Sequence, residues 1–215
     1  MIDKKLDYSV YLVLDPVLTE NLGMVKTAEL AVKGGATVVQ LRAPQWKKRR
    51  RYECAIELKK VLSAYHVPLI IDDDVDIALA CDADGVHVGQ KDLPVDIVRK
   101  MMGPHKILGL SINTISQMRL VAPKLVDYVG VGPVFATSTK PDAATPIGFE
   151  GLRELMKISP VPAVAIGGIK AQHVAQVVKA GAQGVAVVSA ICGQPDPMKC
   201  AAELNRLWQL NSNKN

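Results

Sequence analysis

The chain has 215 residues, 49% of them hydrophobic and 4% aromatic, and a formal net charge of +5, which suits one soluble α/β domain with a full core. No apolar run approaches the roughly 20 residues of a membrane span, and the first residues lack the apolar part of a secretory signal, so a cytoplasmic protein without membrane contact is expected. Five basic residues form one run, residues 47–51, but aromatic side chains for base stacking are scarce, so no nucleic-acid partner is predicted.

Short β-branched runs alternate with helical patterns from end to end, and no Ser-rich or Pro-rich linker divides the chain. The predicted strands lack polar alternation, which indicates parallel strands that are buried on both faces and covered by helices. Eight strands are predicted, at residues 9–14, 37–41, 68–72, 85–88, 107–110, 128–131, 163–166 and 184–188. Eight βα units predict a single α/β domain over residues 1–215, a (β/α)8 TIM barrel.

The chemistry of such a barrel lies at the carboxyl ends of its strands, and nearly every predicted strand is followed by polar residues or glycine. A doubly wound open sheet would present such residues at one switch point only, so their recurrence favours the barrel. The residues concerned are Arg42, Asp72, Asp73, Gln90, Asp92, Ser111, Thr137, Thr139, Lys140, Gly167, Gly168 and Ser189.

Acidic residues follow the third and fourth strands, at residues 72–76 and at Asp92. Carboxylates brought together by adjacent loops repel one another unless a cation or protons compensate for their charge. Such hard oxygen ligands suit Mg²⁺, with water and a substrate phosphate completing its shell. Asp73 and Asp92 are therefore the predicted Mg²⁺ ligands, whereas Asp74 is predicted to cap the following helix and Asp76 to lie in its first turn.

A long loop, residues 132–147, follows the sixth strand and contains glycine, several hydroxyls and one Lys. It exceeds the roughly 2 to 6 residues of an ordinary connection, which is typical of a lid or anion-binding segment, although a flexible surface loop is the alternative. The seventh strand is followed by Gly167 and Gly168 and the eighth by Ser189, a combination typical of a phosphate site, although the glycine pair alone would fit a tight turn. A phosphorylated small-molecule substrate is therefore predicted.

The histidines and cysteines predict no further metal site. The four cysteines form no Cys-x-x-Cys pair and lie far apart, so neither a zinc site nor a disulfide framework is expected. His87 lies in the fourth predicted strand and is interpreted as an imidazole of the core or the barrel interior rather than as a catalytic group.

Several segments resemble the thiamin phosphate synthase family, in order from residue 11 to residue 191: YLVLD, VVQLR, PLIIDD, ADGVHVGQKDLP, GLS, YVGVGPVFATSTKPDA, VAIGGI and GVAVVSAI. The resemblance implies a Mg²⁺-dependent transferase that joins hydroxymethylpyrimidine pyrophosphate to thiazole phosphate in thiamin biosynthesis, giving thiamin phosphate and pyrophosphate. The Thr-x-Thr-Lys-Pro loop resembles the synthase branch rather than the related thiazole tautomerases. A tautomerase-like barrel enzyme and a non-catalytic phosphate-ligand binding relative are the alternatives, and a homo-oligomer is left open.

The resemblance also implies a role for each site residue, with Asp73 and Asp92 holding the metal. Departure of pyrophosphate builds negative charge on the leaving oxygens, so Mg²⁺ and fixed donors are expected to dominate catalysis. The thiazole nitrogen is the nucleophile, and no protein nucleophile is required. The implied substrate contacts are Arg42, Ser111 and Lys140 around the pyrophosphate, Gln40 near the pyrimidine, and Thr137, Thr139, Gly168, Val188 and Ser189 around the thiazole phosphate, with Ser111 and Lys140 as the catalytic pair. Asp72 is a further predicted substrate-binding residue.

The chain departs from the family pattern beside the expected pyrophosphate site. Pro44 stands where a second basic residue is usual, and Asp72 and Asp74 stand where the family has Asn and Arg. These changes remove donors and add carboxylates beside an anionic ligand, which lowers the expected activity. The basic run, residues 47–51, is interpreted as the solvated start of a helix, and Lys47 or Lys48 is the candidate to replace the missing Lys.

Overall fold

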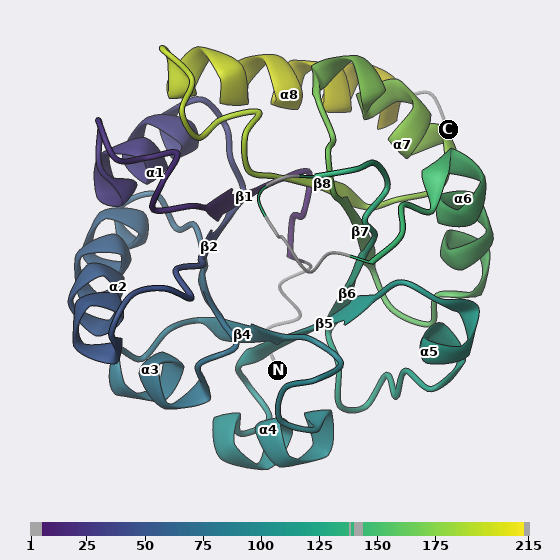
Figure 1. Cartoon of the computed structure of the whole chain (residues 1–215), viewed down its shortest axis with the longest axis horizontal. Helices are drawn as coiled ribbons and strands as arrows, with labels where there is room; N and C mark the ends of the chain where they lie inside the picture. Colours follow the sequence, from purple (N-terminus) through teal and green to yellow (C-terminus); the bar gives the residue numbers. More distant parts are fainter. Residues whose placement is uncertain (1–5, 138, 140–143, 213–215) are drawn as a thin grey trace.

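The computed structural model describes residues 6–137, 139 and 144–212, and it forms a closed barrel of eight parallel strands inside a ring of helices (Figure 1). Each strand pairs with the next along the chain, and β1 closes the barrel by pairing with β8. The strands are β1 (Val10–Leu14), β2 (Val38–Leu41), β3 (Leu69–Asp72), β4 (Gly85–Val88), β5 (Ile107–Ile112), β6 (Tyr128–Val131), β7 (Ala163–Ile166) and β8 (Gly184–Val187). The predicted (β/α)8 barrel is confirmed, and no predicted strand end is displaced by more than two residues.

The helices that surround the barrel each follow a strand in the chain. They are α1 (Met24–Lys33), α2 (Lys48–Ser63), α3 (Val75–Ala80), α4 (Val95–Met102), α5 (Ile115–Arg119), α6 (Gly148–Ile158), the short 3₁₀ helix η1 (Ala171–His173), α7 (Val174–Lys179) and α8 (Pro197–Ser212). Within the described ranges, no helix combines the length and the apolar character needed to cross a membrane.

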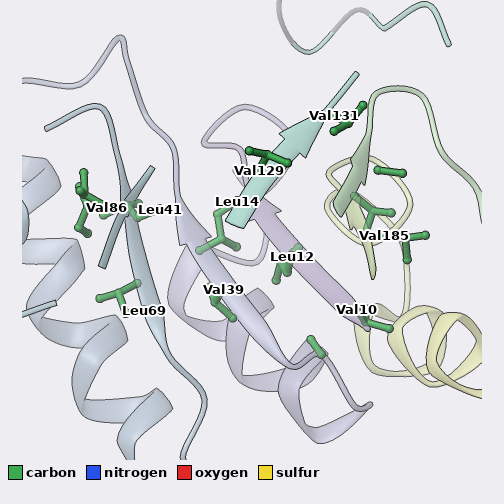
Figure 2. Packing of buried hydrophobic residues seen from close by; sticks show 14 of the residues in the cluster. Val10, Leu12, Leu14, Val39, Leu41, Leu69, Val86, Val129, Val131 and Val185 are labelled. Carbon is green, nitrogen blue, oxygen red and sulfur yellow. The ribbon is translucent and has the colours of Figure 1, made fainter. Parts of the chain in front are cut away.

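Alternate side chains of each strand fill two separate spaces, which explains why the strands lack polar alternation. In β1, Leu12 and Leu14 point toward the helices and pack in the larger core with Val39 of β2 (Figure 2). Tyr11 and Val13 belong to the second cluster, inside the barrel. Since every residue of β1 is buried, the strand needs apolar or hydrogen-bonded side chains on both faces.

The basic run that follows β2 lies at the solvated start of α2, as predicted. Residues 47–50 are exposed and Arg51 is half-buried. The guanidinium carbon of Arg50 lies 3.9 Å from the ring centre of Trp46, so this aromatic side chain is covered by its own segment. The run therefore starts a surface helix, and one member, Arg51, points toward the protein.

Candidate active site

Arg42 and Asp72 lie at the carboxyl ends of β2 and β3 and pair with each other. Arg42 Nε is 3.4 Å from Asp72 Oδ2, and the two side chains are only 18% and 15% exposed. Arg42 Nη1 also donates a hydrogen bond to the backbone oxygen of Thr139 at 3.3 Å. The guanidinium thus links the end of β3 to the long loop after β6, and any anion that binds Arg42 must share it with a carboxylate.

Asp74 occupies the N-cap position of α3, but its side chain forms no capping hydrogen bond, so the predicted side-chain cap is wrong. The carboxylate instead forms an ion pair with Arg51 of α2 and lies 3.5 Å from Lys48 Nζ. A charge-assisted bond to a half-buried guanidinium is stronger than one neutral bond from a backbone N–H, which explains the exchange of partners. The local preference for capping is overridden by a residue from the preceding helix.

Lys48, one candidate to replace the missing family Lys, is engaged on α3. Its Nζ lies 2.6 Å from Asp76 Oδ2 in the first turn of that helix, where Asp76 was predicted to lie. The hydrogen bond from Lys48 lowers the pKa of the Asp76 carboxyl. The described contacts of Lys48 are therefore with Asp76 in α3 and with Asp74 at its N-cap, and none of them is with Arg42.

Asp73 and Asp92, the predicted metal ligands, are both exposed and follow the adjacent strands β3 and β4. Asp73 has a left-handed backbone, with φ of 59°, and its N–H donates to the His87 carbonyl at 2.8 Å, which fastens the end of β3 to β4. Asp92 Oδ2 accepts a 2.7 Å hydrogen bond from the N–H of Gly89. Hydrogen bonds thus order the backbone at Asp73 and the carboxylate of Asp92 at neighbouring strand ends.

The donor set at these two strand ends is chemically suited to Mg²⁺. No group of three or more His, Cys, Asp or Glu side chains arranged to hold a metal occurs among the described residues. Mg²⁺ does not need such a cage, because it commonly binds one or two carboxylates and completes its octahedron with water and substrate phosphates. The exposed carboxylates of Asp73 and Asp92, which follow adjacent strands, are ligands of that kind.

A line of hydrogen bonds runs through the barrel interior and joins two predicted site residues, Gln40 and Ser111. Gln40 Nε2 donates to the Tyr11 hydroxyl at 2.8 Å, and the Tyr11 and Tyr128 hydroxyls are 2.7 Å apart. His87 Nδ1 lies 2.9 Å from the Tyr128 hydroxyl, and His87 Nε2 lies 2.9 Å from Ser111 Oγ. The interpretation of His87 as a buried imidazole of the barrel interior is confirmed, whereas the two tyrosines were missed as neighbours of the site.

Gly167 and Gly168 follow β7, and the first residues of the loop after β6 lie directly against them. Both glycines have positive φ, 102° and 64°. The N–H of Phe135 donates to the Gly167 carbonyl at 3.0 Å, and a Cβ on Gly168 would come within 2.7 Å of the Ala136 oxygen. Side chains are excluded here both by backbone conformation and by the crossing loop, so the pair has a structural reason as well as the predicted functional one.

Ser189 follows β8, and its hydroxyl accepts a 2.8 Å hydrogen bond from Lys170 Nζ. Lys170 lies two residues after Gly168, and its backbone N–H donates to His173 Nδ1 at 3.1 Å. Burial, and secondarily the nearby Lys170 charge, lowers the pKa of His173. Lys170 was not among the predicted site residues, although a basic residue directly after Gly-Gly-Ile at a strand end is a signal for an anion site.

The loop after β6 contributes Thr137 and Thr139, whose hydroxyl oxygens are 2.9 Å apart. The N–H of Thr139 donates to Thr137 Oγ1 at 3.3 Å, so the two threonines form one local turn. The predicted catalytic residue Lys140 lies outside the described residues. Arg42, bonded to the Thr139 carbonyl, is the described contact between this turn and the opposite side of the barrel mouth.

Val188, the remaining predicted substrate contact, directly follows β8 and is half-buried against the core. Its carbonyl accepts hydrogen bonds from the N–H groups of Ile191 and Cys192, at 3.0 and 2.8 Å. The backbone after β8 thus turns at once behind Ser189. This tight turn places Val188 beside the Lys170–Ser189 pair.

Comparison with known proteins connects this arrangement to one family. The family model described as thiamine monophosphate synthase matches residues 10–191. The chain is 51% identical to a thiamine-phosphate synthase of Laribacter hongkongensis, over 95% of this chain and 97% of the relative, and 45% identical to one of Chloroflexus aurantiacus, over 97% and 96%. The solved thiamine phosphate pyrophosphorylase of Pyrococcus furiosus is similar with a TM-score of 0.86 and 34% identity, covering 95% of this chain and 97% of that one. A 3-hexulose-6-phosphate synthase, with a TM-score of 0.65 and 18% identity, shares the fold alone.

Proposed function

The chain belongs to the thiamine monophosphate synthase family, and from this membership we propose that it joins hydroxymethylpyrimidine pyrophosphate to thiazole phosphate, giving thiamin phosphate and pyrophosphate. The observation that carries the proposal is the division of the barrel mouth. Acidic residues and Arg42 follow β2 to β4, while glycines, Lys170 and Ser189 follow β7 and β8. One side suits a metal-bound pyrophosphate and the other suits a second phosphate.

Bond cleavage at the pyrimidine methylene sets the demands on the first side. As the pyrophosphate leaves, negative charge grows on its oxygens and positive charge grows on the carbon. Arg42 and Ser111 bind the leaving group as fixed donors, together with Lys140, which is assigned by the family resemblance. Ser111 is well placed to act as a fixed donor because His87 holds its hydroxyl and Gln90 Nε2 holds its carbonyl at 2.7 Å.

Asp73 and Asp92 are the residues that would hold Mg²⁺. When bound, the ion supplies positive charge that stabilises the departing pyrophosphate. The neighbouring Asp72 keeps Arg42 oriented toward the end of β3 through their ion pair. Arg42 would therefore contact Asp72 and the departing pyrophosphate together.

The second side binds the thiazole phosphate and so positions the attacking nitrogen. Gly168 leaves the backbone accessible to the phosphate, and Val188 and Ser189 contribute backbone and hydroxyl donors. We add Lys170 to this set, since its ammonium group already lies on the Ser189 hydroxyl. Thr137 and Thr139 close over the same phosphate from the loop after β6. Gln40 orients the pyrimidine from inside the barrel.

The direct test is a two-product assay. Purified protein is incubated with Mg²⁺ and both phosphorylated substrates, and thiamin phosphate and pyrophosphate are both measured. We expect equal amounts of the two products. An isomerised thiazole without pyrophosphate would instead indicate a tautomerase, and thermal stabilisation by the substrates without any product would indicate a binding protein.

A further inference from the structure

The hydrogen-bonded line inside the barrel, Gln40–Tyr11–Tyr128–His87–Ser111, is drawn from five different strands. Gln40 lies in β2, Tyr11 in β1, Tyr128 in β6, His87 in β4 and Ser111 in β5. The successive distances are 2.8, 2.7, 2.9 and 2.9 Å. Each link is a good hydrogen bond, so the donor at one end can determine the donors along the whole line.

The amide of Gln40 sets the direction at one end. Its nitrogen has no acceptor capacity, so the Tyr11 oxygen must accept the first hydrogen bond. The Tyr11 side chain is only 2% exposed. Within the described part of the chain, the Tyr128 oxygen is the group that can accept a hydrogen bond from the Tyr11 hydroxyl. The reverse direction would leave the buried Tyr11 proton without that acceptor, which is costly. Tyr11 therefore donates to Tyr128.

The direction of the hydrogen bonds continues through the imidazole of His87. The Tyr128 oxygen accepts a hydrogen bond from Tyr11, so the Tyr128 hydroxyl donates its own proton to a hydrogen bond with His87 Nδ1. A neutral histidine whose Nδ1 accepts carries its proton on Nε2. His87 Nε2 then donates to Ser111 Oγ, and the proton of the Ser111 hydroxyl remains for another acceptor.

We propose that this line fixes His87 as the Nε2-protonated tautomer and thereby makes Ser111 a hydrogen-bond donor to the departing pyrophosphate. Tyr128 and His87 are then positioning residues, which act through Ser111 without touching the substrate. The second half of this inference rests on the proposed role of Ser111, whereas the tautomer of His87 does not. The gain is a hydroxyl proton that is not used in the bond to His87 and can be donated when charge develops on the leaving group.

Two glycines in the barrel wall support a dedicated arrangement. A Cβ on Gly109 of β5 would overlap the Tyr128 hydroxyl and His87 Nδ1, the two atoms of the central hydrogen bond. A Cβ on Gly130 of β6 would lie 3.2 Å from His87 Cε1. Both strands thus lack a side chain where the imidazole and the phenol meet.

The tyrosines keep their protons under ordinary conditions. Burial is the main reason that the pKa of Tyr11 and the pKa of Tyr128 are both raised above the usual value for tyrosine. The line therefore retains its hydroxyl donors at neutral pH. The proposed hydrogen-bond directions require that both tyrosines keep their protons, but they are inferred from the geometry of the four hydrogen bonds.

The tautomer is tested first, by ¹⁵N NMR of histidine-labelled protein without substrate at neutral pH. We expect the His87 ring to show a protonated Nε2 and an unprotonated Nδ1. In the Tyr128→Phe variant the donor to Nδ1 is lost, and we expect a mixture of the two tautomers. A wild-type His87 with its proton on Nδ1 would overturn the proposal whatever the enzyme's activity.

The route through Ser111 is tested by a double-mutant cycle on kcat. Tyr128→Phe is expected to lower kcat roughly tenfold, the effect of one orienting hydrogen bond, and to leave the KM for thiazole phosphate unchanged. In a Ser111→Ala background the same substitution should cost almost nothing further. An equal loss in both backgrounds would reject action through Ser111, and an unchanged kcat in Ser111→Ala alone would reject the proposed role of Ser111 while leaving the tautomer result intact.

Tyr8→Phe is the matched control. The Tyr8 ring is buried in the same interior cluster, with its centre 5.0 Å from that of Tyr128, but its hydroxyl is not part of the line. The control removes one buried hydroxyl without breaking any of the four bonds. We expect unchanged kcat and an unchanged His87 tautomer, and a loss equal to that of Tyr128→Phe would mean that general packing, not hydrogen-bond direction, is responsible.

Discussion

The two sides of the barrel mouth are built from different kinds of group. On the acidic side, formed by Arg42, Asp72, Asp73 and Asp92, charged side chains already interact with one another or with nearby backbone. On the phosphate side, formed by Gly167, Gly168, Lys170, Val188 and Ser189, backbone turns and a Lys–Ser hydrogen bond surround the strand ends. Under the proposed function, the first side needs an added cation to bind an anion, while the second holds its donors without one.

Electrostatics explains the difference in what each side can do alone. Carboxylates repel a pyrophosphate unless positive charge lies between them, and the strength of that effect grows as water is excluded. The phosphate side has no carboxylate among its members, and Lys170 adds positive charge to it. A preorganised site of this kind binds with little rearrangement. The two sides should therefore respond differently to metal removal and to single substitutions.

Removal of the divalent ion should produce the largest difference between the sides. With EDTA in place of Mg²⁺, or with Asp73→Asn or Asp92→Asn at limiting Mg²⁺, turnover is expected to fall about 10²–10³-fold, because stabilisation of the leaving pyrophosphate is lost. Calorimetric binding of thiazole phosphate should change little. Asp96→Asn, which alters an exposed carboxylate in the first turn of α4, serves as the control with normal activity. Full turnover in EDTA would show that the acidic side binds pyrophosphate without a divalent ion.

Crowding of the phosphate side is tested by Gly168→Ala. Gly168 has a left-handed backbone conformation that disfavours a side chain. An added methyl group would also lie only 2.7 Å from the Ala136 oxygen and 2.8 Å from Phe135 Cβ. Gly148→Ala is the matched control, because Gly148 has nearly the same φ, 63° against 64°, but nothing lies within 4 Å of its added Cβ. Both variants carry backbone strain, and overpacking should destabilise Gly168→Ala by about 1–3 kcal/mol more.

The readouts for this pair are the free energy of unfolding in urea and the KM for each substrate. Only Gly168→Ala should raise the KM for thiazole phosphate, because the loop after β6 must move away from the glycine pair. Equal destabilisation of both variants would mean that the loop yields freely. In that case the phosphate side would be less rigid than its hydrogen bonds indicate.

The charge on the phosphate side is tested by Lys170→Met, which keeps the length of the side chain and removes its ammonium group. We expect the KM for thiazole phosphate to rise about tenfold, as for loss of one hydrogen bond to a charged group. The kcat and the KM for the pyrophosphate substrate should change little. Lys179→Met, at an exposed position at the end of α7, tests the effect of net charge alone. An unchanged KM in Lys170→Met would remove Lys170 from the phosphate site.

The fold was predictable because its main signal is local. A run such as Val10–Leu14 is buried throughout, and strands buried on both faces read as unbroken apolar segments whose spacing defines the βα repeat. The same repeat placed the predicted site residues Arg42, Asp73 and Ser189 after the ends of their strands. The ends of the strands can therefore be predicted from sequence to within one or two residues.

The partners of those residues were not predictable, because they come from segments far away in the chain. Asp74 was assigned a capping role on local preference, yet Arg51, 23 residues earlier, takes its carboxylate. Lys170 reaches Ser189 across 19 residues, and Tyr11 reaches Tyr128 across 117. Such contacts depend on how the barrel closes, and no periodicity within one element encodes them.

The smallest expected effect concerns competition for Arg42 on the acidic side, and Asp72→Asn tests it. The substitution keeps the size of the side chain and removes the negative charge 3.4 Å from Arg42 Nε, so the guanidinium becomes more available to pyrophosphate. The pair is a single N–O contact that is longer than a good hydrogen bond, so we expect the KM for the pyrophosphate substrate to fall only about two- to fivefold. Asp76→Asn, which removes an exposed carboxylate paired with Lys48, should leave that KM unchanged. A rise in KM for Asp72→Asn, steepest at low Mg²⁺, would show instead that Asp72 assists the metal, and the acidic side would then contain three metal-directed carboxylates in place of two.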